Sequence, residues 1–179
     1  AHFRLHRALA GASHVTDRHV LALLDDCKRL MGARKDVDVL STDAVGSPAL
    51  FGYRRPQLLM PSELLTAADP SELRHIFLHE LAHLKRRDIL VGHVVSLLHV
   101  LQWFNPLVGL AFQRLRADRE LACDALALSA LGRGETLAYG RTVVRQLERL
   151  HVSHRLPILA SLTGDKSRVK RRIALIAGF

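Results

Sequence analysis

The chain has 179 residues, of which 49% are hydrophobic and 24% are charged. This length fits one domain or two small ones, and the apolar fraction excludes a disordered or collagen-like chain. Two distant cysteines, Cys27 and Cys123, exclude a disulfide scaffold and fit a reducing compartment. The sequence begins at Ala1 without a methionine, so we expect it to belong to a longer protein. No secretory signal precedes the first predicted helix.

The net charge of +9 is concentrated near the C-terminus, where nine basic and two acidic residues follow position 140. A basic segment can face solvent, an anionic membrane or nucleic acid. The run Lys170-Arg171-Arg172 lies in an amphipathic pattern, which favours a solvated helix face, then a membrane. Nucleic acid is not expected as a partner, because no aromatic residues are interleaved for base stacking.

In chain order, the apolar spacing of residues 16–31 predicts an amphipathic helix that ends at Gly32. Short strand-like segments follow at residues 37–40, 48–53 and 57–60, separated by Gly and Pro. They predict a small antiparallel sheet. The fold class is therefore α+β, with helix dominating.

A second helix is predicted over residues 69–87. Asp69 is its expected N-cap, Pro70 occupies its first position, and Glu72 is placed for a capping box. Three further helices are predicted over residues 107–131, 135–150 and 167–177.

The second helix carries the motif His79-Glu80-Leu81-Ala82-His83. Residues four apart share one face of a helix, so both imidazoles can reach one metal ion. Glu80 projects beside them and can take a proton from a metal-bound water. We therefore predict one zinc ion, which accepts nitrogen and oxygen ligands; a solvated polar stripe is the alternative.

A third protein ligand is needed, and Glu120 on a later predicted helix is the best candidate. Asp124, one turn further, could accept the free N–H of a ligating histidine. The alternative is that both belong to an ordinary charged helix face. Cys123 is expected to be a small buried residue, and His75 a cap or surface contact.

No charged residue lies between Asp88 and Arg114, and residues 89–112 could span a bilayer as one helix. A full crossing would put Glu120 on the opposite side of the bilayer from the two histidines. Asn105-Pro106 interrupts the stretch and predicts a helical hairpin instead.

The hairpin could be soluble core or dip into a membrane face. His93 and His99 on it are expected to be hydrogen-bonded interior residues rather than ligands.

Together these residues resemble a known family, the integral-membrane zinc metallopeptidases of the BlaR/MecR antirepressor type, a branch of the gluzincins. The resemblance extends over most of the chain. Its motifs here are Ser47-Pro48-x-x-Phe51-Gly52, Arg55-Pro56, Met60-Pro61, Leu73-Arg74-His75-x-x-x-His79-Glu80-Leu81-Ala82-His83, Arg86-Arg87-Asp88, Trp103-Phe104-Asn105-Pro106, Arg119-Glu120-Leu121-Ala122-Cys123-Asp124 and Lys170-Arg171-Arg172-Ile173.

The resemblance implies that His79, His83 and Glu120 bind zinc, that Glu80 is the catalytic base and acid, and that Asp124 supports the metal shell. It implies a zincin-like domain, with the small sheet packed on the motif helix and the hairpin between that helix and the third ligand. We expect one domain over residues 1–179, in three segments: 1–68, 69–132 and 133–179. In family members this domain lies between transmembrane helices, and its metal site faces the cytosol. Some members carry an extracellular sensor that, on binding a β-lactam, triggers proteolysis of a repressor.

The predicted function is zinc-dependent hydrolysis of peptide bonds in a cytosolic or membrane-proximal protein, such as a transcriptional repressor or signalling protein. Glu80 would move the proton, and the strand at residues 49–53 could pair with an extended substrate. Tyr139, His151 and His154 are candidates for stabilising the oxyanion. Membrane association is expected through flanking helices or the apolar hairpin.

Two alternatives remain at this stage. One is a zinc protease of the CAAX-processing or membrane-protein quality-control type. The other is a non-catalytic basic helical module that binds membrane or nucleic acid.

Overall fold

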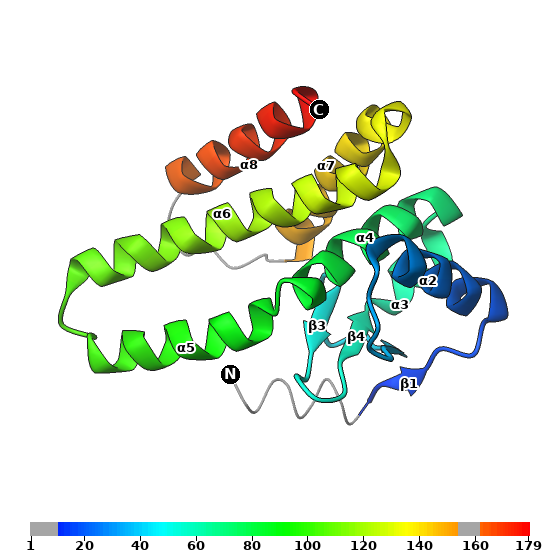
Figure 1. The fold of residues 1–179 in the computed structure, drawn as a ribbon, viewed down its shortest axis with the longest axis horizontal. Coiled ribbons are helices and arrows are strands. Elements are labelled where there is room, and N and C mark those ends of the chain that lie inside the picture. Colours follow the sequence, from blue (N-terminus) through cyan, green and yellow to red (C-terminus); the bar gives the residue numbers. More distant parts are fainter. Residues whose placement is uncertain (1–10, 154–161) are drawn as a thin grey trace.

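The computed structural model describes residues 11–153 and 162–179 and shows a mostly helical fold with one small sheet (Figure 1). The predicted α+β class with dominant helix is confirmed. In chain order the elements are β1 (Ser13–His14), α2 (Arg18–Met31), β2 (Asp38–Ser41), β3 (Ala49–Phe51), β4 (Gln57–Met60), α3 (Ser62–Ala67), α4 (Pro70–Lys85), α5 (Asp88–Leu101), α6 (Pro106–Leu131), the 3-10 helix η1 (Arg133–Glu135), α7 (Thr136–Ser153) and α8 (Leu162–Ala177).

The sheet is mixed, so the prediction of an antiparallel sheet is wrong. Its strand order is β1-β2-β4-β3, with β2 and β4 parallel and the other neighbours antiparallel. The chain passes from β2 to the far edge as β3 and returns as β4 between them. Alternation of apolar residues indicates which face is buried but not the direction of a strand, so the sequence pattern could not reveal this crossing.

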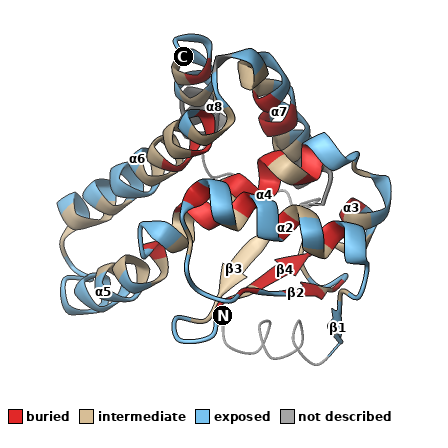
Figure 2. Ribbon diagram, turned by 45° about the vertical axis from the view of Figure 1, so that its right-hand side comes forward, coloured by how far each residue is buried: buried red, intermediate tan, exposed pale blue. Residues whose placement is uncertain are grey.

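Helix α4 lies at the centre of the described fold, where it contacts α2, α6, α7 and β3 (Figure 2). Phe77 and Leu78 are fully buried, and Leu81 is 1% exposed. Burial of a side chain of this size contributes about 1.5–3 kcal/mol. The segment of residues 79–83 therefore stands on a helix whose other faces are fixed by packing.

The start of α4 differs in one respect from the sequence prediction. Asp69 is the N-cap, and its Oδ1 accepts a hydrogen bond from the Glu72 backbone N–H at 2.8 Å. The Glu72 side chain is buried against α7, where its carboxylate accepts from Arg145 and Arg149 at 3.0 and 2.8 Å. Glu72 thus joins two helices through its side chain.

Helices α5 and α6 form a hairpin that projects from the rest of the fold (Figure 1). Asn105 caps α6 by accepting from the Leu107 N–H at 3.1 Å, and Pro106 is its first residue. The expectation that His93 and His99 are interior residues is wrong, because both are exposed. Within the described residues, no helix combines the length and the apolar character needed to cross a membrane.

The turn between β3 and β4 requires glycine at position 52. Gly52 has φ +82°, and a Cβ there would lie 2.5 Å from the Arg55 carbonyl oxygen. We expect Gly52→Ala to lower the free energy of unfolding by about 2 kcal/mol or more, through left-handed strain and this clash. Urea unfolding would measure it. Gly134→Ala is the control, because Gly134 has no neighbour within 4 Å; equal effects of both changes would contradict the prediction.

Candidate metal centre

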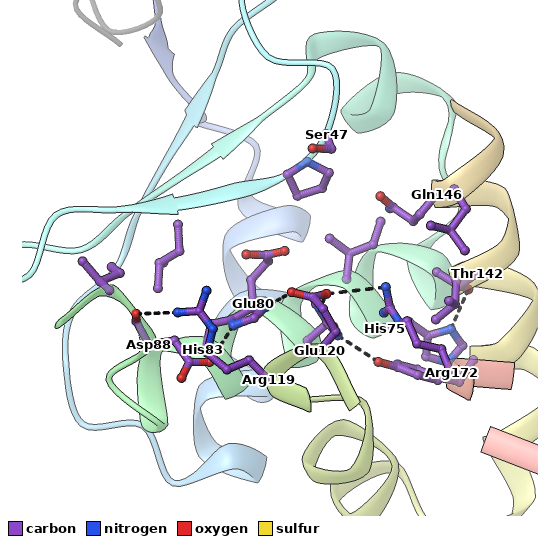
Figure 3. Close-up of a pocket in the computed structure, with 18 of the residues that line it drawn as sticks. Ser47, His75, Glu80, His83, Asp88, Arg119, Glu120, Thr142, Gln146 and Arg172 are labelled. Carbon is purple, nitrogen blue, oxygen red and sulfur yellow. Dashed lines mark hydrogen bonds and ion pairs between the residues drawn. The ribbon is translucent and has the colours of Figure 1, made fainter. Parts of the chain in front are cut away.

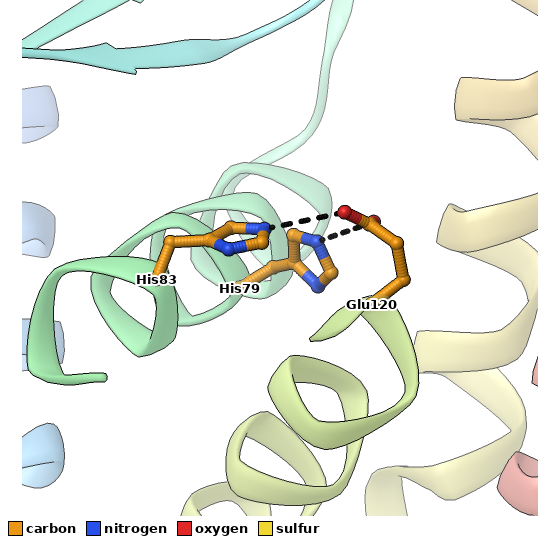
Figure 4. A group of neighbouring side chains, drawn as sticks. All are labelled: His79, His83 and Glu120. Carbon is orange, nitrogen blue, oxygen red and sulfur yellow. Dashed lines mark ion pairs between the residues drawn. The ribbon is translucent and has the colours of Figure 1, made fainter. Parts of the chain in front are cut away.

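His79 and His83 lie one turn apart on α4 and face Glu120 on α6 (Figure 4). The two imidazole centroids are 5.0 Å apart. Nε2 of His79 lies 3.5 Å from Oε2 of Glu120, and Nε2 of His83 lies 3.7 Å from Oε1. The three predicted ligands are therefore brought together, although 37 positions separate Glu120 from His83 in the sequence.

The hairpin is what delivers Glu120 to this place. Helix α5 leads the chain away from α4, and α6 returns and packs against α4. The capped start at Asn105 allows this reversal, because Pro106 needs no backbone partner at a helix start.

The donor set fits a zinc ion. Ligands at about 2.0–2.1 Å from a tetrahedral zinc lie about 3.3 Å from one another. The nitrogen–oxygen distances of 3.5 and 3.7 Å are close to that value. Two imidazoles and one carboxylate also leave the fourth position open, as in catalytic zinc sites.

A buried carboxylate holds His79 from behind. Oδ1 of Asp124, which is 0% exposed, lies 3.1 Å from Nδ1 of His79. The Tyr139 hydroxyl donates to the same oxygen at 2.8 Å. Arg172, from α8, donates to both Asp124 oxygens at 2.7 and 2.8 Å. A carboxylate in this position fixes the histidine tautomer and leaves Nε2 free for a metal ion.

A second carboxylate holds His83. Oδ2 of Asp88, the first residue of α5, lies 2.8 Å from Nδ1 of His83. The buried Sγ of Cys123 lies 3.3 Å from the same nitrogen. Arg119 donates to the Asp88 carbonyl at 3.1 Å. Both histidines therefore present Nε2 to Glu120 because their Nδ1 atoms have partners on other helices.

The charges of the site favour a cation at its centre. Burial alone lowers the pKa of His79, but Asp124 and Glu120 outweigh it and raise this pKa to about 9. Burial raises the pKa of Glu120, but His79 outweighs it, and the result is a pKa of about 2. Asp124 also has a pKa of about 2, because His79 and Arg172 outweigh its burial. The carboxylates are thus ionised and stabilise positive charge beside them.

Glu80 lies in the same cavity, which has a volume of about 450 Å³ (Figure 3). Burial raises the pKa of Glu80, whereas His79 and His83 lower it. The segment before and within β3 forms another wall through Ser47, Pro48 and Leu50. The cavity thus joins the edge of the sheet to the two histidines.

Of the other histidines considered from the sequence, His75 lines the same cavity as His79 and His83 (Figure 3). His75 is not a surface contact: it is 1% exposed, with Nδ1 2.9 Å from the Thr142 hydroxyl and Nε2 3.3 Å from Glu135. His151 lies in the last turn of α7, but its side chain is outside the description. His154 lies outside the described residues.

Sequence reasoning missed the roles of Arg172 and Asp88. Arg172 was assigned to a solvated face, but its side chain is 15% exposed and bound to Asp124. Its neighbours Lys170 and Arg171 are exposed. A signal was available for Asp88, which lies five residues after His83 and opens the uncharged stretch. Nothing local distinguishes Arg172 from the adjacent basic residues.

Comparison with protein families places the chain among peptidases. The chain belongs to the BlaR1 peptidase M56 family, whose model matches residues 1–176. This confirms the resemblance found in the sequence.

Individual proteins agree with this assignment. The chain is 28% identical to the regulatory protein BlaR1 of Bacillus licheniformis over 92% of its own length and 27% of that protein. It is 26% identical to the methicillin resistance MecR1 protein of Staphylococcus aureus over 80% of its length and 25% of that protein. The chain therefore spans about a quarter of the length of these relatives.

Zinc content tests the three ligands. We expect about one zinc ion per purified chain, and close to none after His79→Ala or Glu120→Ala, because two ligands hold the ion poorly. Elemental mass spectrometry would measure the zinc content of each variant, after circular dichroism has shown that the variant is folded. His93→Ala is the control, since His93 is exposed on the hairpin. Full zinc content in the Glu120 variant would contradict the assignment.

Arg172 should set the affinity for the metal. Arg172→Met leaves Asp124 buried without its strongest cation, so that His79 is held less firmly. We expect zinc affinity, measured by chelator competition, to fall about tenfold or more. Arg171→Met is the matched control, because Arg171 is exposed and pairs with the exposed Asp118. Equal affinities of the two variants would contradict this role.

Proposed function

We propose that this chain is a zinc-dependent endopeptidase domain. The observation that carries the proposal is the convergence of two imidazole nitrogens and one carboxylate on a single point, with Glu80 in the same cavity. Membership of a peptidase family supports it. We further propose a zincin-like arrangement and treat residues 1–179 as one domain, because α4, α6 and α8 together build the site.

The proposed chemistry is addition of water to a peptide carbonyl. Bound zinc supplies Lewis acidity, which lowers the pKa of water and polarises the carbonyl. The Glu80 carboxylate takes the proton from the attacking water and delivers it to the leaving nitrogen. Asp124 and Asp88 hold the two imidazoles in the tautomer that presents Nε2. His79, His83 and Glu120 would be the ligands.

Negative charge on the carbonyl oxygen needs a donor, and Arg172 suits this task in addition to its contacts with Asp124. Its NH1 lies 3.5 Å from Oε2 of Glu120, and the residue lines the cavity. Tyr139, which the sequence also suggested, lines the cavity too, but its hydroxyl proton is turned to Asp124. We therefore assign charge stabilisation to Arg172 before Tyr139.

The substrate would bind in extended form along β3. This strand lies at the edge of the sheet and pairs only with β4 among the described strands. A peptide that extends the sheet there gains main-chain hydrogen bonds and passes Ser47, Pro48 and Glu80 in the cavity. The proposed substrate is therefore a segment of a protein, such as a transcriptional repressor or signalling protein, and the proposed location is the cytosolic face of a membrane.

Glu80→Gln separates chemistry from metal binding. The amide cannot accept the proton, so we expect hydrolysis of an unfolded protein such as casein to fall at least about a hundredfold. Zinc content should stay that of the unchanged chain, since Glu80 is not a proposed ligand. Fluorescent-casein cleavage and metal analysis on the same sample would measure both. Glu63→Gln, on the exposed surface of α3, is the control. Undiminished cleavage by the Glu80 variant would refute the mechanism.

A further inference from the structure

The hairpin exposes large apolar side chains where a folded domain normally buries them. We call this set the hairpin patch; it comprises Leu90, Val94, Leu97, Leu98, Val100, Leu101, Trp103, Phe104, Leu107 and Leu110. Trp103 at the turn is 79% exposed, and Leu107 is 71% exposed. Ten large apolar side chains exposed on one projecting element mark a site of interaction.

We propose that the hairpin tip inserts into one leaflet of an anionic lipid bilayer and so holds the metal centre at the membrane surface. The proposal concerns the hairpin itself and does not depend on any segment outside this chain. It is also independent of the proposed hydrolysis, because neither the patch nor its charges belong to the metal site.

The charge pattern favours lipid over a protein partner. No charged residue lies between Asp88 and Arg114, whereas exposed arginines lie behind the tip, at the start of α5 and along α6. We call them the basic collar; they are Arg87, Arg114 and Arg116. Arg86 is not included, because its Nε lies 3.5 Å from Oδ2 of Asp88. An apolar tip followed by a basic band matches the order of layers in an anionic leaflet, with hydrocarbon beneath phosphate.

The polar groups of the hairpin are compatible with this medium. The His93 Nδ1–H donates to the Ile89 carbonyl at 2.7 Å, and the Ser96 hydroxyl donates to the Gly92 carbonyl at 2.8 Å. The His99 ring packs against Phe112, with centroids 5.5 Å apart. His93 and Ser96 therefore each direct one hydrogen bond to a backbone carbonyl within the hairpin, and the His99 ring contacts an aromatic side chain.

The position of the collar sets the depth of insertion. Arg114 lies eight residues after Pro106, which is about 12 Å along α6. The hydrocarbon half of a leaflet is about 15 Å thick, and long arginine side chains can reach back to the phosphates. The distal half of the hairpin thus fits within one leaflet.

This depth places the metal centre at the headgroup layer. Helix α5 is about 21 Å long, so its base lies about 9 Å above the level of Arg114. Asp88, which holds His83, is the first residue of that base. Ile89 and Gly92 of α5 also line the cavity. A substrate would therefore be cleaved close to the membrane surface.

Trp103 is the only tryptophan in the sequence and lies at the tip, so its fluorescence reports insertion directly. We expect the Trp103 emission to shift to the blue on addition of vesicles of phosphatidylcholine with 30% phosphatidylglycerol. Bromine on the acyl chains should quench this emission more strongly than a quencher attached to the headgroup. Binding to pure phosphatidylcholine vesicles should be weaker, and high salt should reduce the difference. An unshifted emission, or quenching from the headgroup alone, would overturn the proposal.

Variants locate the contact. Leu107→Glu keeps Trp103 as reporter and should reduce partitioning into the anionic vesicles about tenfold or more. Leu137→Glu is the matched control, because Leu137 is 78% exposed but lies on α7. Arg114→Gln should weaken binding to the anionic vesicles about fivefold. Equal losses in the Leu107 and Leu137 variants would overturn the proposal. The proposal would also be overturned if, without vesicles, analytical ultracentrifugation showed a dimer and the Trp103 emission was already blue-shifted.

Discussion

The site depends on one buried carboxylate, that of Asp124. It is fully enclosed and accepts hydrogen bonds from Tyr139 of α7 and Arg172 of α8, while its Oδ1 faces His79 of α4. A charge in such a place is costly unless each of its oxygens has partners. Four helices must therefore be in place at once for this group to be accommodated, and the same condition orients the His79 imidazole.

The balance of charge explains why the other groups stand where they do. Glu120 and Asp124 bring two negative charges to His79, and Arg172 alone does not neutralise them within the cluster. These carboxylates favour positive charge on the imidazole, and they raise its pKa to about 9 although burial alone would lower it. A divalent cation between the two Nε2 atoms and Glu120 would neutralise Glu120 directly, while Asp124 keeps its contact with Nδ1 of His79. The electrostatics and the donor geometry thus favour the same occupant.

The sequence was sufficient to predict those parts of the site that depend on local contacts or on the regular geometry of a helix. The spacing of His79 and His83 placed both on one helix face, and Asn105-Pro106 indicated the reversal that returns Glu120. It was insufficient where a choice between similar residues depends on packing. Arg172 differs from Arg171 only by one position on α8, yet it meets a carboxylate 48 residues earlier while Arg171 faces solvent. The parallel pairing of β2 with β4 likewise depends on a path that alternation does not encode.

The turn between α4 and α5 links the hairpin to the candidate metal centre. Among the described residues, Arg87 is the only non-glycine residue with a left-handed backbone, at φ 58°. Its conformation, which costs about 1 kcal/mol, reverses the chain so that Asp88 meets His83. Arg119 of the returning arm then binds the Asp88 carbonyl. Because Asp88 belongs both to the hairpin and to the partners of His83, the two arms cannot change direction without moving an imidazole of the site. The element that carries the apolar tip is therefore also the element that holds one of the two histidines.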